Sequence, residues 1–388
     1  MMRILHVVAT GQRRGAETFA VDLSRALLDS GAEQRVAILR NGHEALVSYD
    51  VPTETIRGTS RGFTMPGLHV EPSKVRQIAR AADVWKPSLI QAHGGEALKY
   101  AVSATFRSRI PVIYRRIGGA PDSITHGVRR RLFARLMRRA NRVVTVAEAL
   151  RKECVELFGI PEESVVTIPN GIDARRIRPV NGRDATRRQL GLGPTTPVIL
   201  SLGALAREKD PVTHVEVGSR ILAARPEAVH LIAGDGPMRP DVEHAVTARG
   251  LGGRTRVLGA RADVGDLLAA SDVLLFASRR SGMEGMPAQL IEAGFAGVPV
   301  VAYAIAGVPE VVVHESTGVL VPHGDTDGLE RAVAWLLDDA GFRKAVGQRA
   351  RTRCRKLFDI RVIADRYLEV YGAATRDWTP MPAKVRSR

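Results

Sequence analysis

The chain has 388 residues, of which 45% are hydrophobic and 25% are charged, an ordinary globular composition that does not fit a disordered or fibrous protein. The length predicts two domains rather than one. No apolar run approaches the roughly 18–20 residues that a membrane-spanning helix needs, and the first apolar run is too short for a signal peptide. The only two cysteines, Cys154 and Cys354, lie far apart without metal-ligand spacing, so we expect a reducing, cytoplasmic location.

The net charge of +16 is unevenly distributed along the chain. Residues 1–180 carry 29 Lys and Arg against 17 Asp and Glu, and the remaining residues carry 28 against 24. Nucleic acid, an anionic membrane surface or a phosphorylated substrate would each explain this excess, and so would a generally arginine-rich proteome. Aromatic residues make up only 5% and no helix-turn-helix pattern is visible, so we do not expect a nucleic-acid partner.

The first half alternates predicted buried strands with predicted helices, which is typical of a parallel sheet. Residues 3–8 read as a strand, a glycine loop follows at 10–17, and a helix continues to about residue 28. Residues 41–72 are rich in loop signals. Further strands are predicted at 36–39, 87–93, 111–116, 142–146 and 165–168, and further helices at 74–85, 128–140 and 148–158.

Two features of this half are candidates for function. His93 stands at the carboxyl end of a predicted strand, the edge of a parallel sheet where ligands bind, although a lone histidine is equally often structural. The helix over 128–140 has an apolar stripe flanked by arginines, which fits either a core-packed helix with a solvated basic side or contact of residues 129–142 with an anionic membrane surface.

The second half repeats the strand–helix alternation. An arginine-rich polar segment at 174–189 is the expected linker, and the polar, proline-containing residues 377–388 are the expected tail. Strands are predicted at 198–203, 229–233, 256–259 and 273–277, and helices at 263–270, 327–337 and 341–373.

The stretch 278–310 holds the strongest candidate binding site. Pro287 is well placed as the first residue of a helix that ends at Gly297, and backbone N–H groups from Gly285 to Ala288 would attract a phosphate there. Glu284 precedes the helix and Glu292 lies about two turns into it, and carboxylates accept hydrogen bonds from sugar hydroxyls. A solvated surface loop and helix would also explain these residues, since such glutamate pairs arise by chance.

Several motifs of this half together resemble the nucleotide-binding signature of glycosyltransferase family 4, the retaining enzymes of GT-B fold. The motifs are residues 284–287, Glu292, residues 297–301, residues 307–310 and residues 317–322. The resemblance extends to most of the chain. It implies two Rossmann-like parallel-sheet domains facing a central cleft, residues 1–175 on the acceptor side and 176–360 on the nucleotide-sugar side, with residues 361–388 forming a helix that crosses back to the first domain and a polar tail.

The resemblance also implies roles for individual residues. Lys209, with Arg207 as a possible helper, binds the donor diphosphate after the strand that ends at Gly203, and Glu284 binds the donor sugar. Glu292 binds the ribose. Catalytic roles are expected for Glu284, Lys209 and His93, and donor binding for Gly15, Gly203, Arg207, Lys209, Gly285, Met286, Pro287 and Glu292.

The sequence departs from the family pattern at three positions. Arg14 replaces the first glycine of the Gly-Gly-Ala-Glu loop, and Ala204 replaces an arginine that relatives use on the diphosphate. Ile117 occupies the place of a histidine that approaches the sugar and acceptor in many relatives. Arg207 could compensate for Ala204, and His93 or the pair Arg115 and Arg116 could compensate for Ile117; the sequence does not choose.

The function predicted from this resemblance is retaining transfer of a hexose from a nucleoside-diphosphate sugar to an acceptor that the sequence does not identify, in cell-envelope or polysaccharide biosynthesis. No cofactor and no metal are expected. A sugar-nucleotide epimerase or a phosphorylase of the same fold is the alternative. The expected location is the cytoplasm, with peripheral contact at the inner face of the membrane if the acceptor is lipid-linked.

Overall fold

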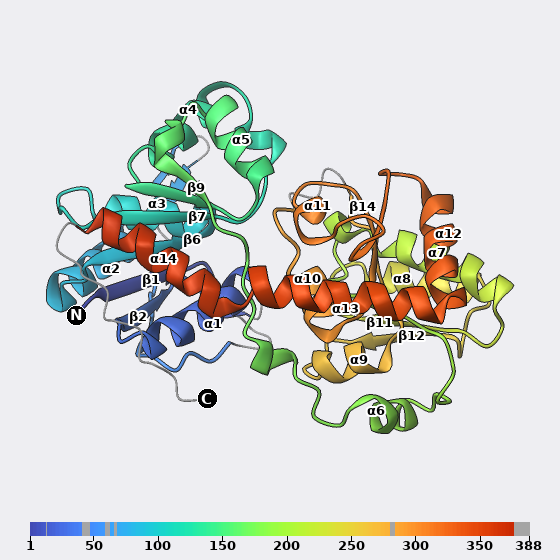
Figure 1. The fold of residues 1–388 in the computed structure, drawn as a ribbon. Coiled ribbons are helices and arrows are strands. Elements are labelled where there is room, and N and C mark those ends of the chain that lie inside the picture. The colour runs from blue at the N-terminus through green and yellow to red at the C-terminus, as the bar shows by residue number, and fades with distance from the viewer. Residues whose placement is uncertain (13, 41–46, 59–62, 66–67, 280–283, 376–388) are drawn as a thin grey trace. The chain divides into compact units, whose positions relative to one another are not determined.

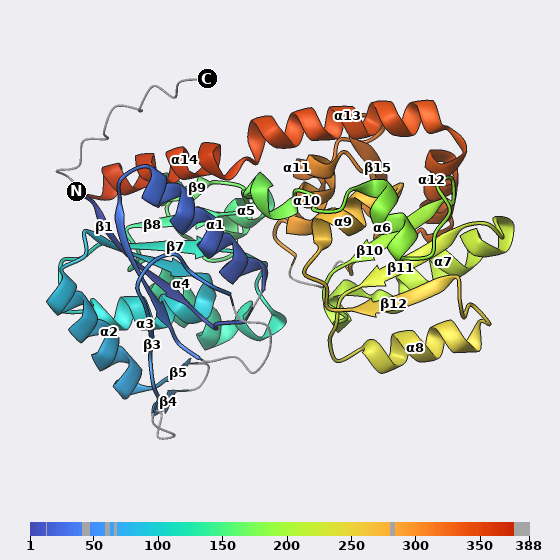
Figure 2. The ribbon, with the colours of Figure 1, turned by 90° about the horizontal axis from the view of Figure 1, so that it is seen from below.

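The computed structural model describes residues 1–375 except residue 13 and the segments 41–46, 59–62, 66–67 and 280–283. The chain forms two compact units, each built on its own parallel sheet (Figures 1 and 2). One unit is Met1–Gly171 together with the chain from Ile360 onward, and the other is Ile172–Asp359. The prediction of two Rossmann-like parallel-sheet domains is confirmed.

The first unit contains a seven-stranded parallel sheet in the order β3-β2-β1-β6-β7-β8-β9. Two short strands, β4 (Phe63–Met65) and β5 (Leu68–Val70), form a separate antiparallel pair. The strands of the main sheet are β1 (Arg3–Val8), β2 (Glu33–Ile38), β3 (Thr53–Thr55), β6 (Leu89–His93), β7 (Val112–Arg116), β8 (Arg142–Thr145) and β9 (Val165–Thr167).

Helices cover both faces of this sheet, and the alternation of side chains along β1 shows how. Leu5 and Val7 belong to the core that includes Ile78 of α2, whereas Ile4 belongs to the core that includes Leu23 of α1 and Tyr367 of α14. The C-terminal helix is therefore part of the first unit. The helices are α1 (Gly15–Asp29), α2 (Pro72–Trp85), α3 (Gly94–Ala104), α4 (Gly127–Met137), α5 (Glu148–Glu156) and α14 (Ile360–Ala374).

The second unit contains a six-stranded parallel sheet in the order β12-β11-β10-β13-β14-β15. Its strands are β10 (Val198–Leu202), β11 (Val229–Ala233), β12 (Thr255–Gly259), β13 (Val273–Phe276), β14 (Val300–Tyr303) and β15 (Gly318–Val321). Its helices are α6 (Arg183–Gln189), α7 (Pro211–Ala224), α8 (Arg239–Ala248), α9 (Val264–Ala270), α10 (Ala288–Ala296), α11 (Val308–Val311), α12 (Thr326–Asp338) and α13 (Ala340–Leu357).

The C-terminal run 341–373, predicted as one helical stretch, is two helices. Phe358 and Asp359 interrupt it, and the carbonyl of Phe358 accepts a hydrogen bond from the N–H of Ile172 at 2.9 Å. This bond joins the two ends of the second unit, since Ile172 is its first residue and Asp359 its last. The helices α3, α6, α7, α8 and α11 were not predicted.

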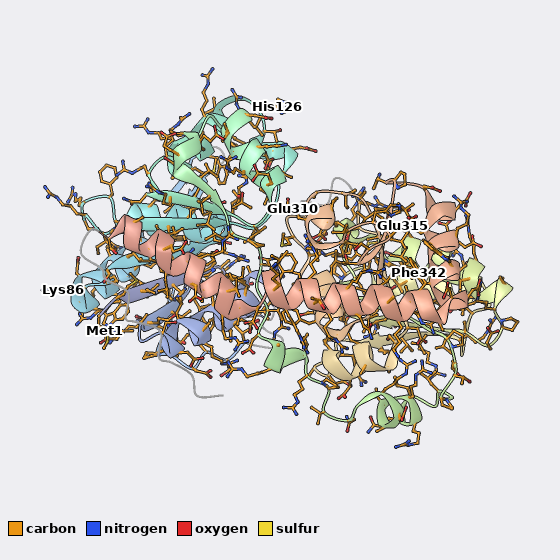
Figure 3. The ribbon with its side chains drawn as sticks, viewed as in Figure 1. Met1, Lys86, His126, Glu310, Glu315 and Phe342 are labelled. Atoms are coloured by element: carbon orange, nitrogen blue, oxygen red, sulfur yellow. The ribbon has the colours of Figure 1, made fainter. Side chains whose placement is uncertain are left out.

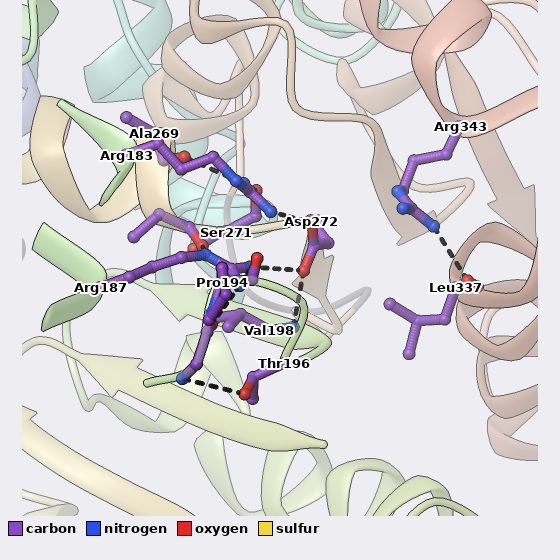
Figure 4. A network of polar contacts seen from close by, with 12 residues as sticks. Arg183, Arg187, Pro194, Thr196, Val198, Ala269, Ser271, Asp272, Leu337 and Arg343 are labelled. Carbon is purple, nitrogen blue, oxygen red and sulfur yellow. Dashed lines mark hydrogen bonds and ion pairs between the residues drawn. The ribbon is translucent and has the colours of Figure 1, made fainter. Parts of the chain in front are cut away.

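The segment 174–189, expected to be a linker, is part of the second unit and packs within it. Its arginines bind Asp272, the residue before β13 (Figure 4). Arg183 Nη2 lies 2.6 Å from Asp272 Oδ1, and Arg187 Nη2 lies 2.9 Å from Asp272 Oδ2, which also accepts from the N–H of Val198. Arg187 is only 1% exposed, and its remaining N–H groups donate to backbone carbonyls of Ala270, Gly193 and Pro194.

Because Arg187 is buried, removal of its counter-charge should destabilise the second unit strongly. Breaking a buried pair by deleting one partner typically costs about 3–5 kcal/mol. We expect Asp272→Ala to lower the free energy of unfolding by about this amount in urea denaturation. Asp338→Ala is the matched control, because Asp338 pairs with Arg225 at a side-chain exposure of 62% and should contribute less than about 1 kcal/mol. Similar losses in both variants would contradict the assigned role of Arg187.

Candidate functional site

The loops after β10 and β11 pack tightly together at the carboxyl edge of the second sheet. A Cβ atom on Gly234 would collide with the carbonyl of Gly203, and both glycines have positive φ angles, 154° and 140°. The chain after Gly203 then forms a 3-10 turn at Arg207–Lys209 before α7. Gly203, predicted as a donor-binding residue, thus allows this close approach.

Lys209 and Glu284 form a charge pair at this edge. Nζ of Lys209 is hydrogen-bonded to Oε1 of Glu284, and Ser278 Oγ lies 3.3 Å from the same oxygen. The Lys209 and Glu284 side chains are 21% and 9% exposed, and Nζ lies 5.6 Å from the ring centroid of Phe276. Lys209 follows β10 and Glu284 follows β13, and these strands are neighbours in the sheet. The structure thus joins two of the residues predicted to be catalytic.

The two loops that carry this pair are tied to each other by further hydrogen bonds. The N–H of Arg279 donates to the carbonyl of Glu208 at 3.1 Å, and Arg279 Nε donates to Asp210 Oδ2 at 2.9 Å. His214, from the first turn of α7, accepts the N–H of Ala277 at Nε2 at 3.0 Å. His214 could not be predicted from the sequence, because nothing in its spacing connects it to Ala277.

His214 must be neutral to accept this bond. Burial lowers the pKa of His214 to about 4, although the nearby Asp210 carboxylate opposes the shift. The imidazole therefore carries its proton on Nδ1 and leaves Nε2 free to accept. A cavity between the ends of β10 and β13 is lined by this ring together with Gly203, Lys209 and Ser278.

Helix α10 begins next to Glu284. Pro287 has an extended ψ of 120° and precedes the helix, so α10 starts at Ala288, one residue later than predicted. Pro287 provides no side-chain cap at this end, and of the first-turn N–H groups that of Leu290 donates to the carbonyl of Pro287 at 3.3 Å. Gly297, with φ of 76°, ends the helix as predicted. Met286 is buried, and the carbonyl of Gly285 accepts the N–H of Gly307 at 2.9 Å.

Glu292 on α10 is already paired in the structure. Its Oε1 lies 2.8 Å from Nη1 of Arg176, and both side chains are largely buried. Arg176 belongs to a 3-10 turn at Ala174–Ile177, 116 positions earlier in the chain. Sequence reasoning missed Arg176 because it fell within the expected linker. Arg207, by contrast, is exposed on the turn that carries Lys209.

Two of the predicted site residues, Gly15 and His93, belong to the first unit. Gly15 begins α1, and a Cβ added there would meet no described atom within 4 Å. His93 is 1% exposed, with Nε2 3.0 Å from Nδ1 of His6, and His6 Nε2 lies 2.9 Å from Oε1 of Gln34. Burial lowers the pKa of both histidines, so this chain of hydrogen bonds is uncharged. A catalytic role for His93 stays a prediction.

The structure also shows where Ile117, Arg115 and Arg116 lie, the residues at and near the position of the family histidine. Ile117, directly after β7, is 37% exposed. Arg115 and Arg116 are buried: the guanidinium of Arg115 lies 3.7 Å from the Phe19 ring centroid, and Arg116 pairs with Glu153. Among the described residues, no three or more His, Cys, Asp or Glu side chains are grouped as for a metal ion.

Two family models match the chain, one over most of each half. The model described as Glycosyltransferase Family 4 matches residues 13–176, and the model described as Glycosyl transferases group 1 matches residues 182–353. The described elements of the candidate site in the second unit, from α6 to α13, fall almost entirely within the latter match.

Two individual relatives match the chain over part of its length. The chain is 31% identical over 218 residues to a GDP-mannose-dependent monoacylated alpha-(1-6)-phosphatidylinositol monomannoside mannosyltransferase of Corynebacterium glutamicum, covering 54% of this chain and 56% of that protein. It is 31% identical over 257 residues to a D-inositol 3-phosphate glycosyltransferase of Kineococcus radiotolerans, covering 61% of this chain and 58% of that protein. The match thus spans less than two thirds of either relative.

The fold is shared with solved structures. The Anabaena protein Alr3699/HepE, crystallised in complex with UDP and glucose, superposes with a TM-score of 0.81 at 22% identity, covering 96% of this chain and 100% of that chain. This likeness confirms the predicted GT-B fold.

Substitutions of His214 test its role at Ala277. Leucine leaves the buried N–H of Ala277 without an acceptor, which costs about 1–3 kcal/mol, whereas the glutamine side chain offers an amide oxygen. We expect His214→Leu to lower the free energy of unfolding at pH 8 by that amount and to speed hydrogen exchange at the Ala277 amide. His214→Gln should change both much less.

The pH dependence provides the control. The folded-state pKa of about 4 lies below the ordinary value of 6.5, so the unfolded protein binds more protons between these values. The stabilisation that the neutral His214 side chain provides is fully present well above pH 6.5 and is lost as the pH falls toward 4. At pH 5 the loss due to His214 is about 2 kcal/mol. His214→Gln should therefore lose about 2 kcal/mol less than the unsubstituted protein between pH 8 and pH 5, and equal losses would contradict the assignment.

Proposed function

Because the chain belongs to the glycosyl transferases of group 1 and family 4, we propose that it transfers a sugar from a nucleoside-diphosphate donor to an acceptor and retains the anomeric configuration. The observation that carries the proposal is the Lys209–Glu284 pair beside the uncapped start of α10. A cation and the start of a helix next to a carboxylate suit a ligand that has both phosphates and hydroxyl groups. The complexes of HepE with UDP and UDP-glucose support such a donor.

Donor binding must rearrange this charge pair. In the free protein Lys209 and Glu284 neutralise each other, and Ser278 supports the same carboxylate oxygen. A diphosphate competes with Glu284 for the ammonium group, because it offers a higher negative charge. Glu284 then has its oxygens free to accept hydrogen bonds from the hydroxyls of the donor sugar. Lys209 is therefore assigned to the diphosphate and Glu284 to the sugar.

The start of α10 provides the remaining support for the phosphates. The N–H groups of its first turn and the helix dipole stabilise negative charge by a mechanism that requires no side chain. Arg207 is exposed on the Lys209 turn and is assigned as a further phosphate contact, which would compensate for Ala204. Residues 285–287 and Gly203 bring the backbone close to the ligand.

Glu292 is assigned to the ribose hydroxyls. Its carboxylate has two oxygens, of which Oε1 is bonded to Arg176. The guanidinium fixes the carboxylate, and the other oxygen can accept from a ribose hydroxyl. Arg176 is thus a positioning residue for nucleotide binding.

The transfer step breaks the bond between the anomeric carbon and the diphosphate oxygen. The electron pair leaves with the diphosphate, where Lys209 and the helix N–H groups stabilise it. The acceptor hydroxyl oxygen forms the new bond on the face that the diphosphate leaves, and its proton passes to the departing phosphate oxygen. The configuration is retained in this front-face reaction without a covalent enzyme intermediate.

Single substitutions should separate the roles of the three charged residues. Losing one leaving-group contact typically costs about 10²–10³ in rate, so Lys209→Ala should lose most turnover. Glu292→Ala should chiefly raise the dissociation constants of UDP and GDP, measured by thermal stabilisation. Glu284→Ala should impair transfer more than binding of the bare nucleotide. Glu208→Ala is the matched control, since this exposed residue is next to Lys209 but engages Arg279 only through its carbonyl. Full activity of Lys209→Ala would overturn the mechanism.

The chemistry makes a second, independent prediction. Since the proposed charge stabilisation comes from Lys209 and the α10 backbone, transfer should survive excess EDTA. The product should keep the anomeric configuration of the donor, as read from the anomeric proton coupling in NMR spectra. An inverted product would contradict front-face attack, and abolition by EDTA with rescue by Mg²⁺ would contradict the metal-free mechanism.

A peripheral membrane contact through residues 129–142 is the last part of the proposal. Among the described residues, no helix has the length and apolarity needed to cross a bilayer. The apolar stripe of α4 is used internally, because Ala134 and Met137 belong to the core. Arg130 and Arg138 donate to backbone carbonyls of the same unit. Arg139 is exposed, but its guanidinium lies 4.4 Å from the Phe106 ring centroid. The other exposed arginines, Arg129, Arg131 and Arg135, are assigned to the anionic surface.

Vesicle binding tests this contact. Each arginine near an anionic surface contributes about 1 kcal/mol, so the triple variant Arg129→Gln, Arg131→Gln, Arg135→Gln should bind phosphatidylglycerol vesicles at least about tenfold more weakly in low salt. The control removes the same charge around α2, by Arg76→Gln, Arg80→Gln and Lys86→Gln. In Figure 3, the label Lys86 marks the end of α2, the helix around which the control substitutions lie, and the label His126 marks the start of α4. Equal binding by both triple variants would contradict the contact.

A further inference from the structure

A second, larger cavity lies in the unit Ile172–Asp359 and shares no lining residue with the cavity beside Lys209. Its volume is about 590 Å³, within the range typical of small-molecule sites. Its walls are the 3-10 turn Ala174–Ile177 and the residues after it, α9, the end of α10, and α13, which runs past α9 and α10 in Figure 2. None of the residue roles assigned above places a ligand in this cavity.

The base of the cavity is apolar and rigidly packed. Ile177 and Phe295 line it and are both buried, and Ala269 of α9 lines it as well. A Cβ atom on Gly265 would collide with the carbonyl of Ile177, so the glycine lets the 3-10 turn lie directly on α9. This surface can receive a small apolar group.

The rim of the cavity is strongly basic. Four arginines line it, namely Arg175, Arg178, Arg351 and Arg355, and no lining residue is acidic. Like charges gathered around one cavity repel each other unless an anion offsets them. The nearest carboxylate that binds one of them is Asp173, which engages Arg175 through Nε and Nη2 at 3.0 and 2.8 Å.

The arginines are of two kinds. Arg175 is fixed by Asp173, and Arg351 is fixed because its Nη2 donates to the carbonyl of Ala296. Arg178 and Arg355 are exposed, and within the described part of the chain neither guanidinium has a hydrogen-bond or ion-pair partner. Each offers a planar fork of donors that matches phosphate oxygens.

We propose that this cavity binds an organic phosphate, that is, a phosphate group carried on a short apolar body. The phosphate lies among the guanidinium groups, with Arg178 and Arg355 as its principal partners, and the apolar body lies on Ile177, Phe295 and Ala269. The same chemistry is presented by a free phosphorylated metabolite and by a phospholipid headgroup, and the test below distinguishes them.

Titration calorimetry with hexyl phosphate is the first arm. The full chain should bind one hexyl phosphate per chain, and more tightly than it binds inorganic phosphate or hexanol, because these lack the apolar body or the charge. Lys209→Ala should bind hexyl phosphate equally well, so the outcome does not depend on the proposed donor site. The double variant Arg178→Gln, Arg355→Gln should bind at least about tenfold more weakly.

A charge-matched control separates a site from general attraction. Arg188→Gln with Lys344→Gln removes two exposed cations that do not line the cavity and should keep the original affinity. All four positions substituted in the two double variants are exposed, so these variants should fold, and equal thermal midpoints would establish this. Equal weakening in both double variants would overturn the proposal.

Vesicles of phosphatidylglycerol in phosphatidylcholine are the second arm. Binding of soluble hexyl phosphate that depends on Arg178 and Arg355 identifies a free organic phosphate as the source. Vesicle binding that depends on the same two arginines, without hexyl phosphate binding, identifies a lipid headgroup. Failure of the cavity variant to differ from the control in both arms overturns the proposal.

Discussion

Burial of both faces of each parallel sheet is the constraint on which the rest of the structure depends. Side chains alternate between two apolar cores, so polar groups with a function are confined to the loops at the strand ends. In the second unit, this brings Lys209 and Glu284 together after adjacent strands. A cation and an anion that are both largely removed from water are stable there only as a pair. In the proposed function, an anionic ligand replaces Glu284 at Lys209, which would couple ligand binding to release of the carboxylate.

The same requirement for neutrality is met differently elsewhere. The second unit uses ion pairs between distant segments, as in Glu292 with Arg176 and Asp272 with Arg183 and Arg187. The first unit buries two neutral imidazoles that are hydrogen-bonded to each other, His6 within β1 and His93 at the end of β6, since burial lowers the pKa of both. The buried guanidinium of Arg115 also lowers the pKa of His93, so the cation in this part of the first unit is the arginine and not the imidazole.

The sequence predicted those features that depend on local pattern. Buried apolar runs located most strands within one or two residues, and Gly297 correctly ended α10 because only a residue tolerant of positive φ closes a helix in this way. Pairings between distant residues could not be derived from spacing, since Lys209 and Glu284 are 75 positions apart and Arg176 and Glu292 are 116 apart. The family resemblance predicted that Lys209 and Glu284 serve one ligand, but not that they bind each other.

The arginines of 174–189 show why polarity alone misled. An arginine-rich segment is normally solvated, and this one is not, because Asp272 and several backbone carbonyls supply buried acceptors that periodicity does not reveal. The 3-10 turn Ala174–Ile177 of this segment contributes residues to both proposed binding sites of the second unit. Arg176 orients Glu292 of the proposed nucleotide site, while Arg175 and Ile177, its immediate neighbours, line the basic cavity. A ligand in that cavity that displaced the turn would also move the guanidinium that holds Glu292. The segment that the sequence indicated to be a connection is therefore the part of the second unit where two binding events can physically meet.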